Sequence, residues 1–386
     1  MITVIADDLT GAAEIAGICL RYAINVSFGI DAIPKKPTQV TVVATDTRSL
    51  SEEDAYNLHQ QLAKKVIENH PKQLIYKKCD SVLRGHVLTE LSALLAVTGK
   101  TKALLQPSNP VGHRCIQNGI YHINAIEIEN TGFASDPDFP AKSSSVKNLL
   151  LDRSSKKEVI QVYSGTISEI HSNGVFIPNC KDEMDLISNL NLYNDDLIIG
   201  GSAAFFEQFL IKLKLASTKI TNEAWRFSVN YLLISGSTHP QSIAFSEKLQ
   251  NQNCPILQFP EALLNEVMDD ECFDKWIQKI SENYNQNNKI GLRISNEIIQ
   301  FSNSSIILKS RLSALVKGFL ERSNCNELFI EGGATAYDVL KKLEWHAFTP
   351  VCELASGVVR MQYNGNPKKH ITIKPGSYQW PNGLLN

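Results

Sequence analysis

The sequence lacks the features that mark secreted, membrane-spanning and nucleic-acid-binding proteins. Its formal net charge is only -2 over 386 residues, which provides no electrostatic basis for binding nucleic acid or an anionic membrane. No apolar run approaches the length that crosses a bilayer, and the first residues have the pattern of a β-strand rather than of a secretory signal. The 8 cysteines are scattered and never form a C-x-x-C pair, so neither a zinc site nor a disulfide framework is expected. We therefore expect a cytoplasmic protein with reduced thiols.

Two common nucleotide-binding motifs are also missing. The chain has no G-x-x-x-x-G-K-[ST] phosphate loop, and no G-x-G-x-x-G follows a predicted strand. Neither a P-loop enzyme nor a standard dinucleotide-binding domain is indicated.

The composition is that of an ordinary globular protein with a substantial core. Hydrophobic residues make up 43% of the chain and charged residues 20%. Because 386 residues exceed the size of one average domain, we expect two domains, and the polar segment 214–228 suggests residues 1–222 and 223–386. The sequence leaves the oligomeric state open, including a homo-oligomer.

Strand and helix patterns alternate nearly throughout, which predicts an α/β fold with mostly parallel sheets flanked by helices. Strands are predicted at 2–6, 39–45, 73–79, 102–106, 158–163, 197–200, 230–237, 255–259, 289–294 and 327–331. Helices are predicted at 11–22, 52–69, 85–97, 143–152, 202–213, 240–250, 271–284, 304–321 and 334–343. The tail 351–380 is predicted to be rich in strands, with a turn at Asn364–Gly365, and the Asn-rich stretch 281–289 to be a loop.

The most informative segment is ITVIADDLTGAA (residues 2–13), where a short apolar strand leads into two adjacent aspartates. Ligands gather at the carboxyl ends of strands in open α/β sheets, so Asp7 and Asp8 suit a site that handles hydroxyl protons or a hydrated cation. Alternatively, an aspartate before Thr10 and Gly11 caps the helix that follows. Capping explains one aspartate more easily than two.

A second polar cluster, KKCDSVLRGH (residues 77–86), also follows a predicted strand. If this strand neighbours the first, Asp80 and Arg84 face the aspartate pair, and Lys78 and Ser81 lie near them. Arginine binds carboxylates with two parallel hydrogen bonds, so Arg84 is a candidate to hold an anionic substrate. Helix capping and solvated charges would explain any one of these residues, but less readily the whole cluster.

A third segment, residues 106–125, follows another buried strand. Asn109 begins a turn, and Arg114 is a second candidate for anion binding. Two prolines and two aspartates in residues 131–140 suggest an ordered loop or lid. A purely structural loop would have the same composition.

Three glycine-bearing strand ends stand out in the second half: ISGSTHP (234–240), EGGATA (331–336) and KPGSYQWP (374–381). Glycine lets a backbone approach a phosphate closely, and a helix N-terminus offers free N–H groups. Ser237 and Thr335 add hydroxyl donors. One such turn is weak support, but three in one predicted domain indicate a nucleotide site.

Together these segments resemble the four-carbon acid sugar kinase family. The resemblance rests on IADDLTGA, KCDSVLRG, the NP…R…G-Y segment, FASDP, GSTHP, EGGATA and the closing KPG, which occur in order from residue 5 to about residue 378. It implies an N-terminal acid-sugar-binding domain, a C-terminal nucleotide-binding domain and a cleft between them. It also implies transfer of the γ-phosphate of ATP to the terminal hydroxyl of threonate, erythronate or 3-oxo-tetronate, with Mg²⁺ bridging phosphate oxygens.

The resemblance assigns roles to particular positions of this chain. The catalytic candidates are Asp7, Asp8 and Asp80, one of which would accept the proton of the attacking hydroxyl. The substrate-binding candidates are Thr10, Gly11, Lys78, Ser81, Arg84, Asn109 and Arg114, with Arg84 and Lys78 holding the substrate carboxylate. The nucleotide-binding candidates are Ser235, Ser237, Gly332, Gly333, Ala334, Thr335 and Gly376. No metal ligand can be assigned.

The chain also departs from the family pattern. Ala334 stands where an acidic residue is common, His113 where glycine usually precedes the arginine, and Ser377–Tyr378–Gln379 where the family is rich in glycine. Two other classes therefore stay open. One is a nicotinamide-dependent hydroxy-acid dehydrogenase, which the missing G-x-G-x-x-G disfavours. The other is a non-catalytic acid-sugar-binding protein, which Ala334 keeps in consideration.

Overall fold

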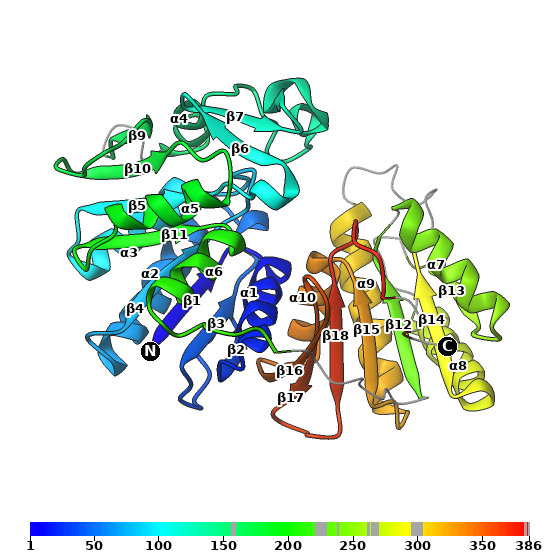
Figure 1. Cartoon of the computed structure of the whole chain (residues 1–386). Coiled ribbons are helices and arrows are strands. Elements are labelled where there is room, and N and C mark those ends of the chain that lie inside the picture. Colours follow the sequence, from blue (N-terminus) through cyan, green and yellow to red (C-terminus); the bar gives the residue numbers. More distant parts are fainter. Residues whose placement is uncertain are drawn as a thin grey trace. The chain divides into compact units, whose positions relative to one another are not determined.

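A computed structural model describes residues 1–155, 160–220, 230–237, 239–260, 263, 270–294, 304–381 and 384. It divides the chain into two compact units, unit 1 (Met1–Ile220) and unit 2 (Thr221–Asn386), and each has an α/β fold (Figure 1). The predicted α/β class is confirmed. The domain boundary predicted at 222/223 falls within residues 221–229, which lie outside the described residues.

Within the described part of unit 1, eight parallel strands form a sheet in the order β2-β3-β1-β4-β11-β5-β10-β9. These strands are β1 (Ile2–Ala6), β2 (Val26–Ile30), β3 (Val40–Ala44), β4 (Leu74–Lys78), β5 (Lys102–Gln106), β9 (Val162–Gly165), β10 (Gly174–Pro178) and β11 (Leu197–Gly201). The central strands are buried on both faces, which explains why their sequences are nearly continuous apolar runs.

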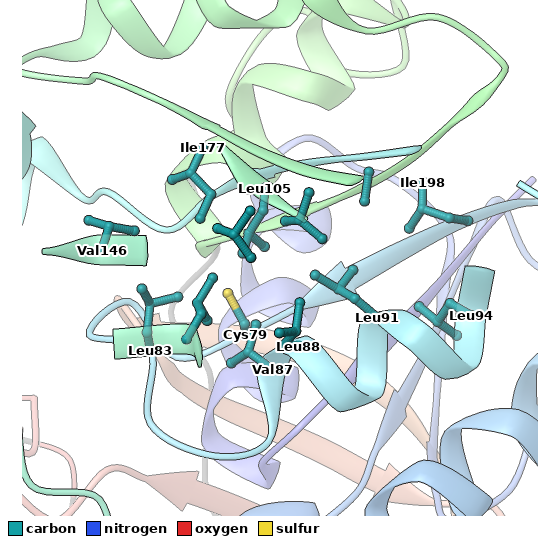
Figure 2. Close-up of a cluster of buried hydrophobic side chains, with 14 of the residues drawn as sticks. Cys79, Leu83, Val87, Leu88, Leu91, Leu94, Leu105, Val146, Ile177 and Ile198 are labelled. Atoms are coloured by element: carbon teal, nitrogen blue, oxygen red, sulfur yellow. The ribbon is translucent and has the colours of Figure 1, made fainter. Parts of the chain in front are cut away.

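Helices cover both faces of this sheet. Helices α1 (Leu9–Arg21), α5 (Glu183–Asn189) and α6 (Ala203–Lys212) pack together, and α2 (Glu52–Asn69), α3 (Val87–Thr98) and α4 (Val146–Leu151) form a second group. Figure 2 shows part of the core, in which Leu91 and Leu94 of α3 pack with Leu105 of β5 and Ile198 of β11. The apolar face of α3 therefore anchors the polar segment that precedes it.

Several of these helices begin at a side chain that caps the backbone. Asp8, Ser51, Ser145, Asp182 and Ser202 each accept a hydrogen bond from the amide three residues later. Aspartate and serine are favoured at this position because their oxygens satisfy amides that have no partner within the helix. Local sequence thus sets where these helices start.

A small antiparallel sheet of β6 (Arg114–Gln117), β7 (Ile120–Ile123) and β8 (Ile126–Glu127) also belongs to unit 1. Asn118 and Gly119 join β6 to β7 with φ angles of 51° and 74°. Asn-Gly is a favoured pair for a two-residue turn with positive φ angles, so this hairpin is encoded locally.

In the described part of unit 2 the strand order is β13-β14-β12-β15-β18-β17-β16. The first five strands are parallel: β13 (Ile256–Gln258), β14 (Lys289–Arg293), β12 (Tyr231–Ser235), β15 (Glu327–Glu331) and β18 (His370–Lys374). The last two, β17 (Val358–Tyr363) and β16 (Ala347–Ala355), are antiparallel. The helices are α7 (Pro240–Asn251), α8 (Asp270–Asn287), α9 (Ser304–Glu321) and α10 (Gly333–Lys342).

Most predicted elements match the structure within a few residues, but some predictions are wrong. Strands β2 and β10 were not predicted, and β16 begins before the predicted tail. Residues 281–287 belong to α8 rather than to a loop, because Tyr284 is buried against Phe319 and the Asn287 amide bonds the helix backbone. Tertiary packing thus overrides the low helix propensity of asparagine. Residues 158–159 of the predicted strand 158–163 lie outside the described residues.

Each of the 8 cysteines has a free thiol. Among the helices of the described residues, none is both long and apolar enough to span a membrane.

Candidate active site

The strands of unit 1 end level with one another. Their register pairs Ala6 of β1 with Ala44 of β3 and Lys78 of β4, and Lys78 with Gly201 of β11. The polar segments that follow these strands therefore meet at one edge of the sheet. Because β1 and β4 are neighbours, the condition for Asp80 and Arg84 to lie near the aspartate pair is met. We call this region the charged edge; it comprises Asp7, Asp8, Arg48, Asp80 and Arg84.

Arg48 lies among the three catalytic candidates. Its Nε atom is 2.7 Å from Oδ2 of Asp7, and its NH2 atom is 3.1 Å from Oδ1 of Asp8 and 3.6 Å from Oδ1 of Asp80. One guanidinium group thus holds three carboxylates that would otherwise repel one another. These carboxylates raise the pKa of Arg48 against the lowering effect of burial.

Arg48 was not identified in the sequence, although a signal was available. It follows β3, which was predicted as a strand, so it lies at a strand carboxyl end like Asp7 and Asp80. A single arginine after a strand carries no motif, so the sequence alone does not single out the segment Thr47–Ser49.

Asp8 is both an N-cap and a member of the charged edge. Its Oδ1 accepts from the Gly11 amide at 3.0 Å, and its Oδ2 accepts from the Thr10 hydroxyl. Burial would raise the pKa of Asp8, but Arg48 and Lys78 hold it below the usual range. The capping and chemical interpretations of this residue are therefore compatible.

Asp7 is completely enclosed. Its Oδ2 pairs with Arg48, but its Oδ1 has no hydrogen-bond partner among the described residues. Burial raises the pKa of Asp7 despite the nearby cations Arg48 and Lys77. Asp7 cannot be explained as a helix cap.

Arg84 and Asp80 form a close pair. Nε of Arg84 is 2.8 Å from Oδ2 of Asp80, and NH2 is 3.1 Å from Oδ1. Although Asp80 is buried, Arg48 and Arg84 hold its pKa well below the usual range. The guanidinium of Arg84 is thus already engaged with a carboxylate, and its NH1 lies 3.5 Å from Asp136 of the 131–140 loop.

Arg114 is placed differently. It donates to the hydroxyl of Ser81, and the described residues offer it no carboxylate within ion-pair distance. Arg84 and Arg114 both lie over the ring of Phe133, at 5.8 and 5.9 Å from its centre. The predicted loop 131–140 therefore contacts both arginines.

Asn109 shapes the turn that presents Arg114. Its backbone exchanges two hydrogen bonds with Arg114, and its side chain accepts from Gly112 at 3.2 Å. The intervening His113 has a φ of 54°, in the left-handed region where glycine is usual. The conformation expected at this position is thus kept in spite of the histidine.

Lys78 and Gly11 lie close together beneath the charged edge. The Lys78 ammonium donates to the Cys79 carbonyl at 3.0 Å and lies 4.0 Å from the Glu14 carboxylate. A Cβ atom at position 11 would lie 2.7 Å from this ammonium and 2.6 Å from Asp8. A side chain at position 11 would displace the Lys78 ammonium or the Asp8 carboxylate, so glycine allows their close approach.

A fully buried ion pair supports the charged edge from inside. The Lys77 ammonium lies 2.9 Å from Oε2 of Glu90, whose Oε1 accepts from the Thr47 hydroxyl at 2.5 Å. His59 lies 4.0 Å from the same carboxylate, and burial lowers its pKa to about 4. Because Thr47 precedes Arg48, this group helps to fix the arginine.

The acidic cluster does not fit a resident metal ion. Arg48 lies where a cation would neutralise the three aspartates. In the part of the chain that the structure describes, no group of three or more His, Cys, Asp or Glu side chains could hold a metal.

In unit 2 the predicted glycine turns also follow adjacent strands. The register pairs Ser235 of β12 with Glu331 of β15, and Glu331 with Lys374 of β18. The segments after these three strands therefore meet at one edge, which we call the glycine edge. It comprises Ser235, Gly236, Ser237, Gly332, Gly333, Ala334, Thr335 and Gly376.

Two contacts show why glycine is needed there. A Cβ atom at position 236 would lie 1.9 Å from the Thr335 hydroxyl, and one at position 376 would lie 2.9 Å from the Ser237 hydroxyl. Gly332 has a φ of 97°, which residues with side chains rarely adopt. The turns are packed against one another more closely than larger residues allow.

Helix α10 begins at the glycine edge without a side-chain cap. Its N-cap is Gly332, which makes no side-chain cap, and among the described residues no side chain accepts from the amides of the first turn, which starts at Gly333. Such free amides, with the positive end of the helix dipole, favour a bound anion. Ala334 is exposed in this first turn, whereas Thr335 is buried.

Comparison with known proteins identifies the family. A model of a sugar-binding N-terminal domain matches residues 2–207, and a model of a nucleotide-binding C-terminal domain matches residues 232–378. The chain is 27% identical to D-threonate kinase of Salmonella typhimurium over 175 residues and 29% identical to D-erythronate kinase of Heliobacterium modesticaldum over 160 residues. The chain belongs to the four-carbon acid sugar kinase family. The charged edge lies in the part matched by the sugar-binding model, and the glycine edge in the part matched by the nucleotide-binding model.

The similarity to individual family members is distant. The two alignments cover 45% and 40% of this chain, and the chain spans 40% and 36% of the length of these curated relatives. Among solved structures, Haemophilus influenzae protein HI1011 has a TM-score of 0.73 at 16% identity, with all of both chains covered. A crystal structure from Salmonella typhimurium has a TM-score of 0.78 at 16% identity and covers 98% of this chain and 96% of that one. These two structures share the fold.

One buried group beneath the glycine edge was not identified in the sequence. Glu331 accepts from the Trp380 indole at 2.6 Å and from the Ser235 hydroxyl, and it lies 3.2 Å from the Lys374 ammonium. Burial lowers the pKa of Lys374, and Glu331 opposes that shift. These residues are far apart in the sequence, so only the register of β12, β15 and β18 brings them together.

Proposed function

We propose that the protein transfers the γ-phosphate of ATP to the terminal hydroxyl of a four-carbon acid sugar such as threonate, erythronate or 3-oxo-tetronate. The observation that carries this proposal is the charged edge, where guanidinium and carboxylate groups suited to a hydroxy acid follow adjacent strands. The family domains and the names of the relatives support the same reaction class. We infer that the reaction takes place in the cytoplasm, where ATP is available.

We assign the substrate carboxylate to Arg114. Arg84 already binds both oxygens of Asp80, whereas no carboxylate of the described residues pairs with Arg114. A partly buried cation gains most from an anionic ligand when no other carboxylate neutralises it. This assignment replaces the one made from the sequence, in which Arg84 and Lys78 hold the carboxylate. Ser81 and Asn109 then act by orienting Arg114.

We assign the attacking hydroxyl to Asp8. Its side chain is 15% exposed, whereas Asp7 is enclosed and Asp80 is held by two arginines. A general base must come within hydrogen-bond distance of the proton that it takes, which favours the exposed carboxylate. In this proposal Asp7 positions Arg48, and Thr10 orients Asp8.

We assign the phosphates of ATP to the glycine edge. The uncapped amides at the start of α10 and the close approach that Gly236 and Gly376 allow suit phosphate oxygens. Phosphoryl transfer mainly requires that the reactants are positioned and their charge neutralised. Mg²⁺ would arrive bound to the phosphates as part of the substrate, since it is commonly held by few protein ligands.

A coupled assay of ADP release with a panel of four-carbon acid sugars tests the proposal. We expect turnover with at least one of them, a fall in kcat of about a hundredfold or more for Asp8→Asn, and a rise of about tenfold in the acid-sugar KM for Arg114→Met. Arg322→Met is a matched control, because Arg322 pairs with Asp274 at the surface of unit 2.

Three results would contradict the proposal. Undiminished turnover in both Asp8→Asn and Arg114→Met would exclude these residues from the reaction. Acid-sugar binding without ADP release would favour a non-catalytic binding protein. Binding of NAD(H) with oxidation of a hydroxy acid would favour a dehydrogenase.

A further inference from the structure

The Lys374 ammonium is completely buried among oxygen atoms. It lies 2.7 Å from the carbonyl of Tyr378, 3.0 Å from that of Pro375 and 3.3 Å from that of Gly376. The carboxylate of Glu331 is 3.2 Å away on the neighbouring strand. A lysine ammonium has three hydrogens, so four acceptors around it use all its capacity as a donor.

These contacts hold one turn of the backbone in place. The carbonyl of Gly376 also accepts from the hydroxyls of Ser237 and Ser242, at 3.5 and 3.2 Å. Three carbonyls of residues 375–378 are thus drawn inward to the ammonium. The amides of Gly376 and Ser377 donate no hydrogen bond to any described residue, which leaves them available to a ligand.

We propose that Lys374 is a built-in monovalent cation that positions the 375–378 turn for the phosphates of the nucleotide. Carbonyl and carboxylate oxygens are the groups that replace water around a dehydrated K⁺ ion. The lysine supplies the same charge covalently, so the turn does not depend on a dissolved cation. This inference rests on the proposed binding of ATP at the glycine edge, and Lys374 acts on ATP through the turn rather than by direct contact.

The same strand provides a matched control. Glu327, at the other end of β15, binds Arg360 through two hydrogen bonds of 2.7 and 2.8 Å, and this pair is also buried. Both pairs contribute to the interior of unit 2, but only Lys374 contacts the glycine turns. Loss of either cation should destabilise the fold, and only loss of Lys374 should change nucleotide binding.

The first experiment measures KM values and thermal stability for Lys374→Met and Arg360→Met. We expect Lys374→Met to raise the KM for ATP at least tenfold with the acid-sugar KM within twofold of the wild type. Both variants should lower Tm by similar amounts, but Arg360→Met should leave the KM for ATP within twofold of the wild type. An unchanged KM for ATP in Lys374→Met, or an equal rise in both variants, would overturn the inference.

The second experiment is chemical rescue. Lys374→Ala leaves space for a small cation, so ammonium or n-propylammonium chloride should restore ATP binding, measured by calorimetry, about tenfold, while choline chloride should not. The wild type should be equally active in potassium and choline salts. Absence of rescue, or a potassium requirement in the wild type, would contradict the inference. A wild type that binds no ATP at all would instead contradict the proposed function.

Discussion

The two units carry different kinds of residue at the ends of their strands. At the charged edge of unit 1, side chains carry the chemistry, and one arginine lies among three aspartates. At the glycine edge of unit 2, side chains are small, and glycines such as Gly236 and Gly332 hold the backbone where a larger residue would clash or be strained. Parallel strands of the same kind thus support a site that handles hydroxyl and carboxylate groups and a site suited to phosphate.

The comparison extends to the layer beneath each edge. Each unit buries a lysine–glutamate pair there, Lys77–Glu90 in unit 1 and Lys374–Glu331 in unit 2. Lys77 and Glu90 support the segment that carries a charged side chain, whereas Lys374 holds backbone carbonyls. Similar ion pairs therefore position a side chain in one unit and a turn in the other.

The largest expected effect is on the buried pair of unit 1. Lys77→Met leaves Glu90 buried without its ammonium, so we expect the free energy of unfolding to fall by about 3–5 kcal/mol. Urea denaturation measures this change. The double variant Lys77→Met, Glu90→Leu should recover much of the loss. A loss below about 1 kcal/mol in the single variant would show that the pair is not essential to the edge.

His59 should make the free energy of unfolding depend on pH, by about 3 kcal/mol. Its folded pKa of about 4 lies below the ordinary value of 6.5, so the unfolded chain binds a proton that the folded chain excludes. This contribution to stability is complete above pH 6.5 and is lost as the pH falls toward 4. Denaturation at several pH values should show the loss, and His59→Gln should reduce its slope. If the free energy of unfolding of His59→Gln falls as steeply with pH as that of the wild type, His59 is not the cause.

Gly236→Ala tests the steric basis of the glycine edge. The added Cβ would lie 1.9 Å from the Thr335 hydroxyl, so we expect a loss of about 1–3 kcal/mol of stability and weaker ATP binding. Gly132→Ala is the control, because no atom lies within 4 Å of the added group. Calorimetry with ATP measures the binding. Normal affinity in Gly236→Ala would show that the turn tolerates a side chain.

The smallest expected change in stability is at Asp8, where two variants separate its role as a helix cap from its role in catalysis. Asparagine caps helices as well as aspartate does, so Asp8→Asn should lower kcat while it loses only the ion pair with Arg48 and keeps the cap. Asp8→Ala should also lose about 1 kcal/mol of stability. Thermal denaturation of the two variants, beside their turnover, makes the distinction. A large loss of stability in Asp8→Asn would mean that its charge is structural.

Much of the fold could be predicted because the pattern of each element is local. Apolar runs such as residues 2–6 and 327–331 are strands buried on both faces, and serine or aspartate marks the start of several helices. The strands β2 and β10 were missed because their apolar runs are short: Ser27 and Gly29 interrupt β2, and Gly174 and Pro178 leave β10 only three apolar residues between them. The segment 281–287 was misjudged because its helix depends on packing rather than on propensity.

The sequence by itself determined which groups stand at the strand ends: Asp7, Asp8 and Asp80 in unit 1, and the glycine turns in unit 2. Only the tertiary structure decided which of these groups are already paired. Arg84 is bound by Asp80, Arg48 joins the three aspartates, and Lys374 reaches Glu331. Arg84 and Asp80 lie only four residues apart, but the pairs of Arg48 and Lys374 depend on strand register and on contacts between residues far apart in the chain. No periodicity or motif in the sequence records those contacts.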